Sequence, residues 1–214
     1  MPSPVFLPGQ KLVFIGDSIT DAGRRTEAYA PYGRGYVFLV YSFLHARYPE
    51  LALTVVNQGI GGNTVRDLKA RWERDVIAEQ PDWLSVKIGI NDVWRQVTGR
   101  LDEAVPLEEY IATYRALLQE TRARTSARLI LMEPYVIEPD HSDPFRSLMN
   151  RYVAAVDALA EEFQAILVRT QAAFDEAMKK QPPSFWAADR VHPGGPGHAV
   201  IARAFLQAVG YGDV

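Results

Sequence analysis

A short apolar run near the start of the chain ends in a serine that is well placed for chemistry. Residues 12–15 (LVFI) are followed directly by Gly16-Asp17-Ser18. The run is typical of a strand buried on both faces of a parallel sheet, and glycine permits a sharp turn where the strand stops. Open α/β sheets bind their ligands at the carboxyl ends of strands. Ser18 could therefore be a nucleophile, although Gly-x-Ser alone is also typical of a helix cap or an ST-turn.

A second stretch, far along the chain, supplies the partners that a serine nucleophile needs. Asp189 and His192 stand three residues apart in the sequence DRVHP. A serine nucleophile requires a base, and the base requires a carboxylate that orients it. Of the four histidines, only His192 has a carboxylate placed locally for that task. These residue types and their spacing predict acyl transfer by Ser18, His192 and Asp189.

Two further loops carry groups that can stabilise negative charge. One contains the glycines of NQGIGGN, and the other contains Asn91 in GIND. Each follows an expected strand, and the carboxyl ends of parallel strands lie at one edge of a sheet. The N–H of Ser18, an N–H of the glycine loop and the Asn91 amide could thus converge on one oxygen. Such an arrangement would be an oxyanion hole for a tetrahedral acyl intermediate.

Two other kinds of site are compatible with residues of these types. A phosphate-binding loop is not predicted, because the G-x-x-x-x-G-K-[ST] spacing is absent. A metal site formed by Asp17, Asp21, Asp189 and His192 is an alternative, because hard cations can bind scattered carboxylates. It lacks paired-histidine or Glu-x-x-His spacing and leaves Ser18 without a task. We therefore expect no metal and no cofactor.

The elements that must position these residues alternate between strands and helices. Apolar runs predict five strands, over residues 12–15, 51–57, 83–88, 128–132 and 165–169. Helices are expected over residues 35–48, 64–79 and 107–121, from 144 onward, and over 171–179 and 199–209, with loops at 20–32 and 181–197. The charges of the 64–79 helix are expected to face solvent. This alternation predicts a parallel sheet covered on both faces, in a single domain over residues 1–214.

Composition limits the classes of function. The chain has 214 residues, 48% of them hydrophobic, which is enough for one domain with a substantial core. A net charge of −3 argues against nucleic acid as a partner, and no window approaches the ~20 apolar residues of a membrane span. The absence of cysteine excludes disulfides, Cys-ligated zinc and a thiol nucleophile. We expect a cytoplasmic protein, because the first residues lack the pattern of a secretory signal. A homo-oligomer is compatible with the sequence.

Four short blocks together resemble the SGNH hydrolases, also called the GDSL family of esterases. They are Gly16-Asp17-Ser18, the segment from Asn57 to Gly62, GIND at 89–92, and DRVHP at 189–193, in the order of the family. The resemblance implies a flavodoxin-like α/β/α sandwich of three layers with five parallel strands. It also implies a Ser-His-Asp triad and an oxyanion hole formed by the Ser18 N–H, a glycine N–H of the second block and the Asn91 side chain.

The chain departs from the family pattern at three positions. Ile19 stands where leucine is usual, Gly61 where serine is frequent, and Asn63 where aspartate is frequent. Because Gly59, Gly61 and Gly62 lie close together, several N–H groups could point into the site. We favour Gly62.

Longer segments resemble bacterial acetylxylan esterases of this family that carry no signal sequence. These segments are NQGIGGNTVRDLKARWERDV, IGINDVWRQ, TQAAFDEA and ADRVHP. The resemblance implies the removal of acetyl groups from xylan fragments inside the cell, through an acetyl-serine intermediate. Trp94 and Trp186 flank the catalytic blocks and are candidates for contact with an acetylated sugar, as is Asp17 next to Ser18 in the sequence.

Two alternatives remain open at this point. One is a generalist esterase or thioesterase for short acyl chains, which the release of acetate from xylo-oligosaccharides would distinguish from a deacetylase of sugars. The other is a catalytically inactive carbohydrate-binding protein, against which the intact Ser18, Asp189 and His192 argue.

Overall fold

A five-stranded parallel sheet forms the centre of the computed structural model, which describes residues 4–212. The strands lie in the order β2-β1-β3-β4-β5, and each neighbouring pair is parallel. They are β1 (Lys11–Gly16), β2 (Thr54–Gly59), β3 (Trp83–Lys87), β4 (Arg128–Met132) and β5 (Ile166–Val168). The predicted α/β class and the five parallel strands are confirmed, and the strand order is that of flavodoxin-like sheets.

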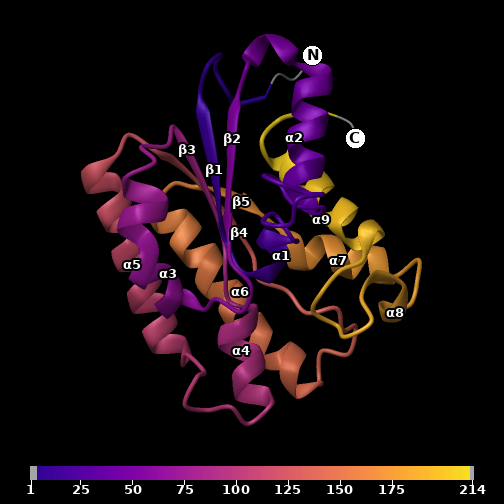
Figure 1. Cartoon of the computed structure of the whole chain (residues 1–214). Helices are drawn as coiled ribbons and strands as arrows, with labels where there is room; N and C mark the ends of the chain where they lie inside the picture. The colour runs from indigo at the N-terminus through magenta and orange to yellow at the C-terminus, as the bar shows by residue number, and fades with distance from the viewer. Residues whose placement is uncertain (1–3, 213–214) are drawn as a thin grey trace.

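Helices cover both faces of the sheet, which makes three layers (Figure 1). One face carries α3 (Val65–Trp72), α5 (Leu107–Arg124) and α6 (Pro144–Glu162). The other carries α2 (Tyr36–Arg47), α7 (Thr170–Met178) and α9 (Gly195–Ala208). Shorter helices are α1 (Ser18–Asp21), α4 (Ile90–Val97) and α8 (Pro183–Trp186), with a 3₁₀ turn at Pro49–Leu51 and a π-helical turn at Glu73–Ile77. No helix within residues 4–212 combines the length and apolar character needed to cross a bilayer.

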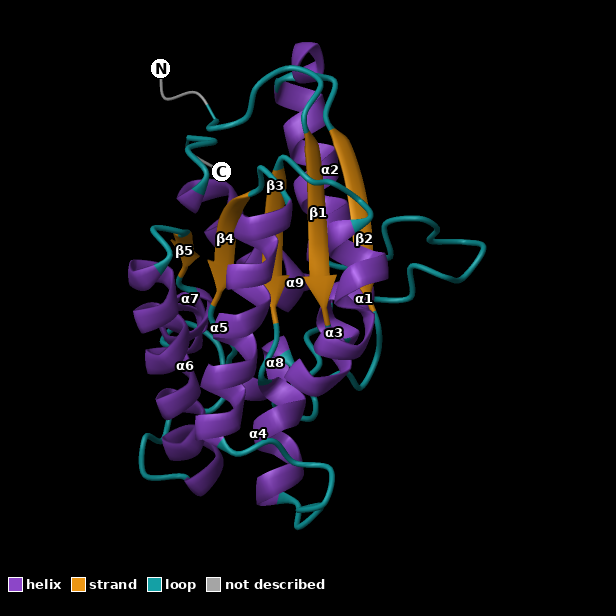
Figure 2. Ribbon diagram, turned by 90° about the vertical axis from the view of Figure 1, so that its left-hand side faces the viewer, coloured by secondary structure: helices purple, strands orange, loops and turns teal. Residues whose placement is uncertain are grey.

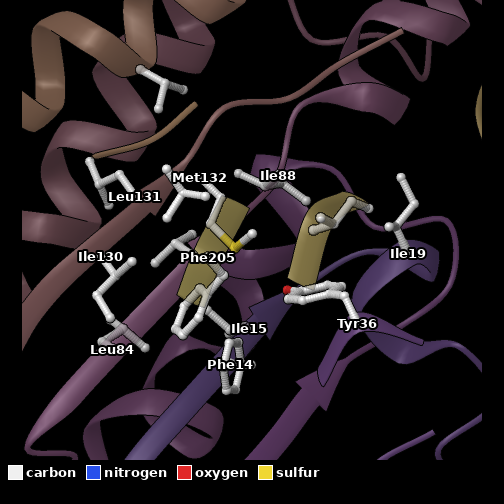
Figure 3. Packing of buried hydrophobic residues seen from close by; sticks show 14 of the residues in the cluster. Phe14, Ile15, Ile19, Tyr36, Leu84, Ile88, Ile130, Leu131, Met132 and Phe205 are labelled. Carbon is white, nitrogen blue, oxygen red and sulfur yellow. The ribbon is translucent and has the colours of Figure 1, made fainter. Parts of the chain in front are cut away.

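The core is built from side chains on both faces of the central strands (Figure 3). Phe14 of β1 lies with its ring centroid 5.8 Å from that of Tyr36 and 5.1 Å from that of Phe205. Every residue of β3 is buried, and its apolar members form a nearly continuous run. A strand that is covered on both faces carries apolar side chains on both, so it appears in the sequence as an apolar run. The apolar segments therefore predict the sheet well.

The strands end level with one another at a single edge. Gly16 pairs in register with Gly59 on one side and with Lys87 on the other. In Figure 2 the arrowheads of the strands point to this edge, where α1 and α4 lie. A Cβ atom on Gly16 would lie 2.3 Å from the Lys87 carbonyl oxygen and 2.4 Å from Thr20 Oγ1. Glycine is therefore required for the chain to fold back tightly into α1.

Several boundaries differ from the sequence predictions. The short helices α1, α4 and α8 were not expected, and β2 begins at Thr54, after a 3₁₀ turn that ends at Ala52 in a left-handed conformation. The helix expected over 64–79 is α-helical only to Trp72 and then widens into the π turn. Its start is sharp, because Thr64 and Asp67 form a reciprocal capping box.

Candidate active site

Ser18 is the first residue of α1, directly after the turn that ends β1. The preceding residue, Asp17, is the N-cap, and its Oδ1 accepts a hydrogen bond from Ile19 N at 2.9 Å. Residues in the first turn of a helix have no intrahelical acceptor for their N–H groups. Ser18 therefore presents both its hydroxyl and its amide N–H at the carboxyl edge of the sheet. The capping role that the sequence left open for the serine belongs to Asp17.

The loop that precedes α9 places an imidazole against the Ser18 hydroxyl. Ser18 Oγ lies 2.9 Å from His192 Nε2, and His192 Nδ1 lies 2.7 Å from Asp189 Oδ2. Asp189 Oδ1 also accepts the backbone N–H groups of Val191 at 3.0 Å and His192 at 2.7 Å. One carboxylate thus fixes both the backbone and the ring of the histidine. The sequence prediction that these three residues come together is matched by this geometry.

The surroundings of Asp189 favour its ionised form. Partial burial raises the pKa of Asp189, but hydrogen bonds from the His192 ring and from the two backbone N–H groups outweigh it. The net result is an Asp189 pKa below its ordinary value. An ionised carboxylate accepts the Nδ1–H of a neutral imidazole, which leaves Nε2 unprotonated and able to take a proton from the serine.

Three residues with hydrogen-bond donors line one cavity in front of Ser18. The N–H groups of Ser18 and Gly62 have no protein acceptor within residues 4–212. Gly62 has φ = +78°, a conformation that glycine adopts without strain. Asn91 Nδ2 donates to Asn63 O at 3.0 Å, which leaves the second hydrogen of this amide for another acceptor. Ser18, Gly62 and Asn91 line one common cavity, which agrees with the oxyanion hole expected from the sequence.

Cavities lie on both sides of the Ser18–His192 pair. The first has a volume of about 500 Å³ and extends over α4, with Trp94, Arg95, Thr98 and Arg100 in its lining. The second has a volume of about 470 Å³ and lies between the loop after α1 and the start of α9, with Arg34 and His198 in its lining. A bound ester can therefore extend in two directions from the serine.

His198 does not provide a second base. Burial is the main cause that lowers its pKa to about 4, and nearby positive charges act in the same direction. Its Nδ1 accepts the Tyr36 N–H at 3.2 Å, at the start of α2. His198 is therefore neutral near pH 7 and serves as an acceptor that holds α2 in place.

The three candidates for substrate contact lie in different environments. Trp94 lines the first cavity, and its ring centroid lies 5.9 Å from that of His192 in an edge-to-face arrangement. Trp186 lines a separate groove between α7 and α9, and its indole N–H donates to Gln181 O. Asp17 is fully buried and does not line either cavity next to Ser18. Of the three, only Trp94 is positioned to touch a ligand at Ser18.

A buried arginine of α3 connects the turn of the nucleophile with the glycine loop. Arg71 donates to Gly16 O at 3.0 Å, Gln58 O at 2.7 Å and Asn63 Oδ1 at 2.8 Å. Its charge is balanced by the buried Asp75, at 2.7 Å. The expectation that the charges of this helix face solvent is therefore wrong for Arg71 and Asp75. The i, i+4 spacing of Arg71 and Asp75 is compatible with an ion pair, but the contacts with Gly16 O and Gln58 O join distant backbone segments that the sequence does not mark.

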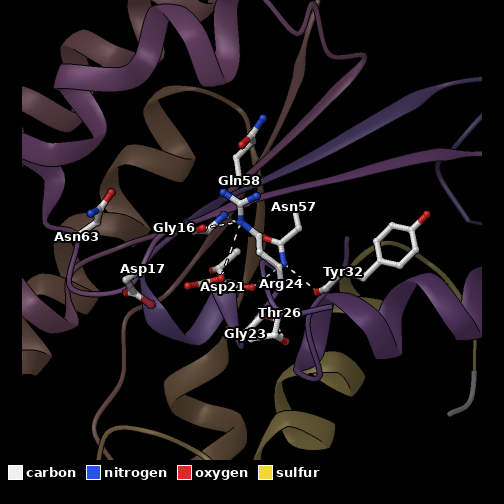
Figure 4. A network of polar contacts seen from close by, with 12 residues as sticks. Gly16, Asp17, Asp21, Gly23, Arg24, Thr26, Tyr32, Asn57, Gln58 and Asn63 are labelled. Atoms are coloured by element: carbon white, nitrogen blue, oxygen red, sulfur yellow. Dashed lines mark hydrogen bonds and ion pairs between the residues drawn. The ribbon is translucent and has the colours of Figure 1, made fainter. Parts of the chain in front are cut away.

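Two further residues hold the loop after α1 against the end of β2 (Figure 4). Arg24 Nε donates to Gly59 O at 2.7 Å. Asn57 Nδ2 donates to Thr20 O at 2.8 Å and to Tyr32 O at 2.9 Å, and its Oδ1 accepts the Gly59 N–H. Asn57, in the second sequence block, thus links these backbone segments by hydrogen bonds, and it is only 4% exposed.

The residues of the metal alternative do not gather into one cluster. Over the range 4–212, no group of three or more histidine and acidic side chains is arranged so that it could hold a metal ion. Asp189 is engaged with His192, and Asp17 with Ile19 N.

Comparison with known proteins identifies the architecture around this site. The model of the GDSL-like Lipase/Acylhydrolase family matches residues 14–200, a range that holds both the serine turn and the histidine loop. The chain belongs to this family. It is a carboxylic ester hydrolase, as the geometry of the serine, histidine and aspartate also indicates.

Individual relatives agree with this assignment. An acetylxylan esterase of Geobacillus stearothermophilus is 52% identical over 209 residues, which cover 95% of each chain. The crystal structure of an acetylxylan esterase from the same organism matches this GDSL-like hydrolase with a TM-score of 0.92 and 50% identity, over 96% of each chain. An α/β-hydrolase enzyme from the metagenome of Lake Arreo, Spain, matches with a TM-score of 0.92 and 45% identity, over 97% of this chain and 98% of that one. The predicted family is confirmed.

Proposed function

We propose that the protein removes acetyl groups from acetylated xylan fragments through an acetyl-serine intermediate, with Ser18 as nucleophile, His192 as base and Asp189 as the orienting acid. The observation that carries the mechanism is the continuous pair of contacts from Ser18 Oγ to His192 Nε2 at 2.9 Å and from His192 Nδ1 to Asp189 Oδ2 at 2.7 Å. The relative that is 52% identical is named an acetylxylan esterase, which supports the substrate class. Solved catalytic mutants of the Geobacillus acetylxylan esterase replace a serine, an aspartate or a histidine by alanine, which supports the same three residue types here.

In the first half of the reaction, Ser18 Oγ attacks the acetyl carbonyl carbon and its proton passes to His192 Nε2. The carbonyl oxygen becomes negatively charged and is met by the N–H groups of Ser18 and Gly62 and by the Asn91 amide. Preorganised donors of this kind stabilise the tetrahedral intermediate more than the substrate. The intermediate collapses when the imidazolium returns the proton to the sugar oxygen, which leaves as an alcohol. The acetyl group then remains on Ser18.

In the second half, a water molecule takes the place of the sugar. His192 Nε2 removes a proton from the water as it attacks the acetyl-serine, and the same three donors meet the second oxyanion. Collapse of this intermediate returns the proton to Ser18 Oγ and releases acetate. Asp189 stays ionised throughout and stabilises the imidazolium that forms in each half.

Trp94 is the side chain best placed to support the sugar. It is half-buried, lines the 500 Å³ cavity that contains Ser18, and lies beside His192. Trp186 and Asp17 have no such position in this proposal. The compartment implied by the sequence resemblance is the cytoplasm, where short xylan fragments would be the substrate.

The deciding experiment compares the wild type with Ser18→Ala on acetylated xylo-oligosaccharides, with release of acetate as the readout. We expect no turnover from Ser18→Ala, together with an unchanged circular dichroism spectrum. A phosphonate ester that labels the wild type should leave Ser18→Ala unmodified. Retained activity in the folded variant would overturn the covalent mechanism. Faster cleavage of short-chain thioesters than of acetylated sugars would favour the short-acyl esterase or thioesterase instead.

A further inference from the structure

Helix α4 sends two side chains, one turn apart, to consecutive carbonyl groups of the glycine loop. Asn91 Nδ2 donates to Asn63 O at 3.0 Å, and Arg95 Nη2 donates to Gly62 O at 2.6 Å. Residues four positions apart lie on the same face of a helix, so the two contacts reinforce each other. The candidate oxyanion residue Asn91 and the loop that carries the Gly62 N–H are thereby joined in one unit.

The guanidinium of Arg95 is held from its other side as well. Arg95 Nη1 donates to Glu103 O at 3.3 Å, and its Nε lies 3.7 Å from Glu103 Oε2. Glu103 in turn forms an ion pair with Arg100. The Arg95 side chain is only 17% exposed, unlike a typical surface arginine. Its position is therefore fixed by the segment after α4, and its donor is directed at the loop.

Gly62 needs an external support of this kind. It follows another glycine, and its φ of +78° is one of several conformations open to a residue without a side chain. Rotation about the Gly62 backbone would change the direction of its N–H, and Gly62 lines the cavity that contains Ser18. A charge-assisted hydrogen bond to the carbonyl of the same residue restricts this rotation, and such bonds are stronger than neutral ones.

We propose that Arg95 is a positioning residue for the oxyanion hole: it holds the Gly62 carbonyl so that the Gly62 N–H points at the developing oxyanion. This inference rests on the proposed acyl-transfer function of Ser18. It assigns to Arg95 an effect on the transition state for any ester, including one without a sugar. A side chain that only contacted sugar would instead affect the binding of carbohydrate substrates.

The test measures kcat and KM of Arg95→Met and Arg95→Lys on 4-nitrophenyl acetate and on acetylated xylo-oligosaccharides. Arg95→Met should lower kcat on 4-nitrophenyl acetate by about 10- to 100-fold, since small misplacements of catalytic groups have effects of this size. The KM for this small ester should change less than about threefold, because the ground state does not yet use the donor. Arg95→Lys retains a charged donor and should recover part of the loss.

The matched control is Arg66→Met, which removes an exposed arginine of α3 that pairs with Glu109. Its kcat should stay within about twofold of the wild type, in line with the small effects of exposed ion pairs. The rate of labelling of Ser18 by a phosphonate should fall in Arg95→Met in parallel with kcat, because the phosphonyl oxygen occupies the oxyanion hole. Circular dichroism and thermal unfolding verify that each variant is folded. If Arg95→Met does not fold, the test uses Arg95→Lys alone, whose kcat should still be lower than that of the wild type.

Two results would overturn the proposal. One is a kcat on 4-nitrophenyl acetate within twofold of the wild type for both Arg95 variants. The other is a loss confined to KM for the acetylated sugar, which would make Arg95 a substrate contact. A wild type that cleaves 4-nitrophenyl acetate but not acetylated sugars would refute the proposed substrate and leave the Arg95 comparison intact.

Discussion

Asp189 accepts two hydrogen bonds from His192 and a third from the neighbouring Val191, within a single turn of the chain. Its Oδ2 accepts from the ring Nδ1 at 2.7 Å, while its Oδ1 accepts the N–H groups of His192 and Val191. Arg190, between them, has φ = +68°, which is uncommon for a residue other than glycine or asparagine. Its guanidinium pairs with Glu138 and Asp143, so the tight turn is anchored from outside.

Asp189→Asn should lower kcat by up to about 10⁴-fold, as the loss of the orienting acid does in serine proteases. An amide at position 189 can donate to Nδ1, which stabilises the tautomer with a proton on Nε2. That tautomer cannot accept the Ser18 proton. The measurement is kcat on an aryl acetate, with the circular dichroism spectrum as the check on folding. Activity equal to that of the wild type would mean that another group orients His192.

Asn91→Ala should lower kcat by about 10²–10³-fold, the usual loss of one oxyanion donor. KM should change much less, since the ground-state carbonyl is not yet placed to use the bond. The bond to Asn63 O is also lost, so we expect a decrease in stability of about 1 kcal/mol. Asn91→Asp should be no more active, because it places a carboxylate beside the developing negative charge. A variant with normal kcat and only a lowered melting temperature would remove Asn91 from the site.

The contacts among Ser18, His192 and Asp189 could be predicted from the sequence because a serine nucleophile requires a base and the base requires an orienting carboxylate. The strands could be found because burial on both faces demands an apolar run, as in β3 and β4. The helix that carries Asn91 was missed because it has eight residues and no side-chain cap at Gly89. A strand-end loop was the simpler interpretation of GIND, but both lead to the same position at the edge of the sheet.

The residues that support the site could not be predicted from the sequence, for a different reason. Arg71 and Arg95 reach the turn after β1 and the glycine loop through backbone carbonyl oxygens, which every residue possesses, so these partners are not marked in the sequence. Lys87 lies in a strand whose other residues are apolar except Ser85, and its burial follows only from the helices packed on both faces. Trp186 and Trp94 are of the same type and both lie near sequence blocks of the site. Only the folded chain distinguishes the one that lines the cavity with Ser18.

Asp92 should make stability depend on pH. Burial is the main cause that raises its pKa to about 7, although the Val65 N–H donates to its Oδ1. In the unfolded chain the pKa of an aspartate is about 3.9. Between about pH 4 and pH 7 the folded protein therefore holds a proton on Asp92 that the unfolded chain releases. Because the folded state binds more protons, the free energy of unfolding decreases as the pH rises through this range.

The corresponding variant is Asp92→Asn, which keeps the acceptor for Val65 N and cannot ionise. From pH 4 to pH 7, the free energy of unfolding of the wild type should fall relative to that of Asp92→Asn, by about 1–4 kcal/mol. Urea unfolding at several pH values measures this difference. Asp102→Asn, in an exposed loop, is the control and should follow the wild type. Parallel curves for the wild type and Asp92→Asn would show that Asp92 is ionised in the folded protein.

Lys87 and Asp17 are two buried titratable groups at the end of β3 and in the turn that follows β1. Both are buried, and neither Lys87 Nζ nor Asp17 Oδ2 has a hydrogen-bond partner within residues 4–212. Burial lowers the pKa of Lys87 and raises that of Asp17, and each charge opposes the shift of the other. Lys87 Nζ also lies 4.5 Å from the centroid of the Tyr135 ring, within the distance of a cation–π contact.

A double-mutant cycle with Lys87→Met and Asp17→Asn should therefore show coupling. Lys87→Met alone leaves the buried Asp17 without its counter-charge and should destabilise the protein by about 3 kcal/mol, because an uncompensated buried charge is costly. Asp17→Asn retains an acceptor for Ile19 N but leaves the lysine unbalanced. In the double variant both charges are absent, so its loss of stability should be smaller than the sum of the single losses by about 1–3 kcal/mol. Urea unfolding of the four proteins at one pH measures the coupling. Losses that add to within about 0.5 kcal/mol would show that the two charges act independently.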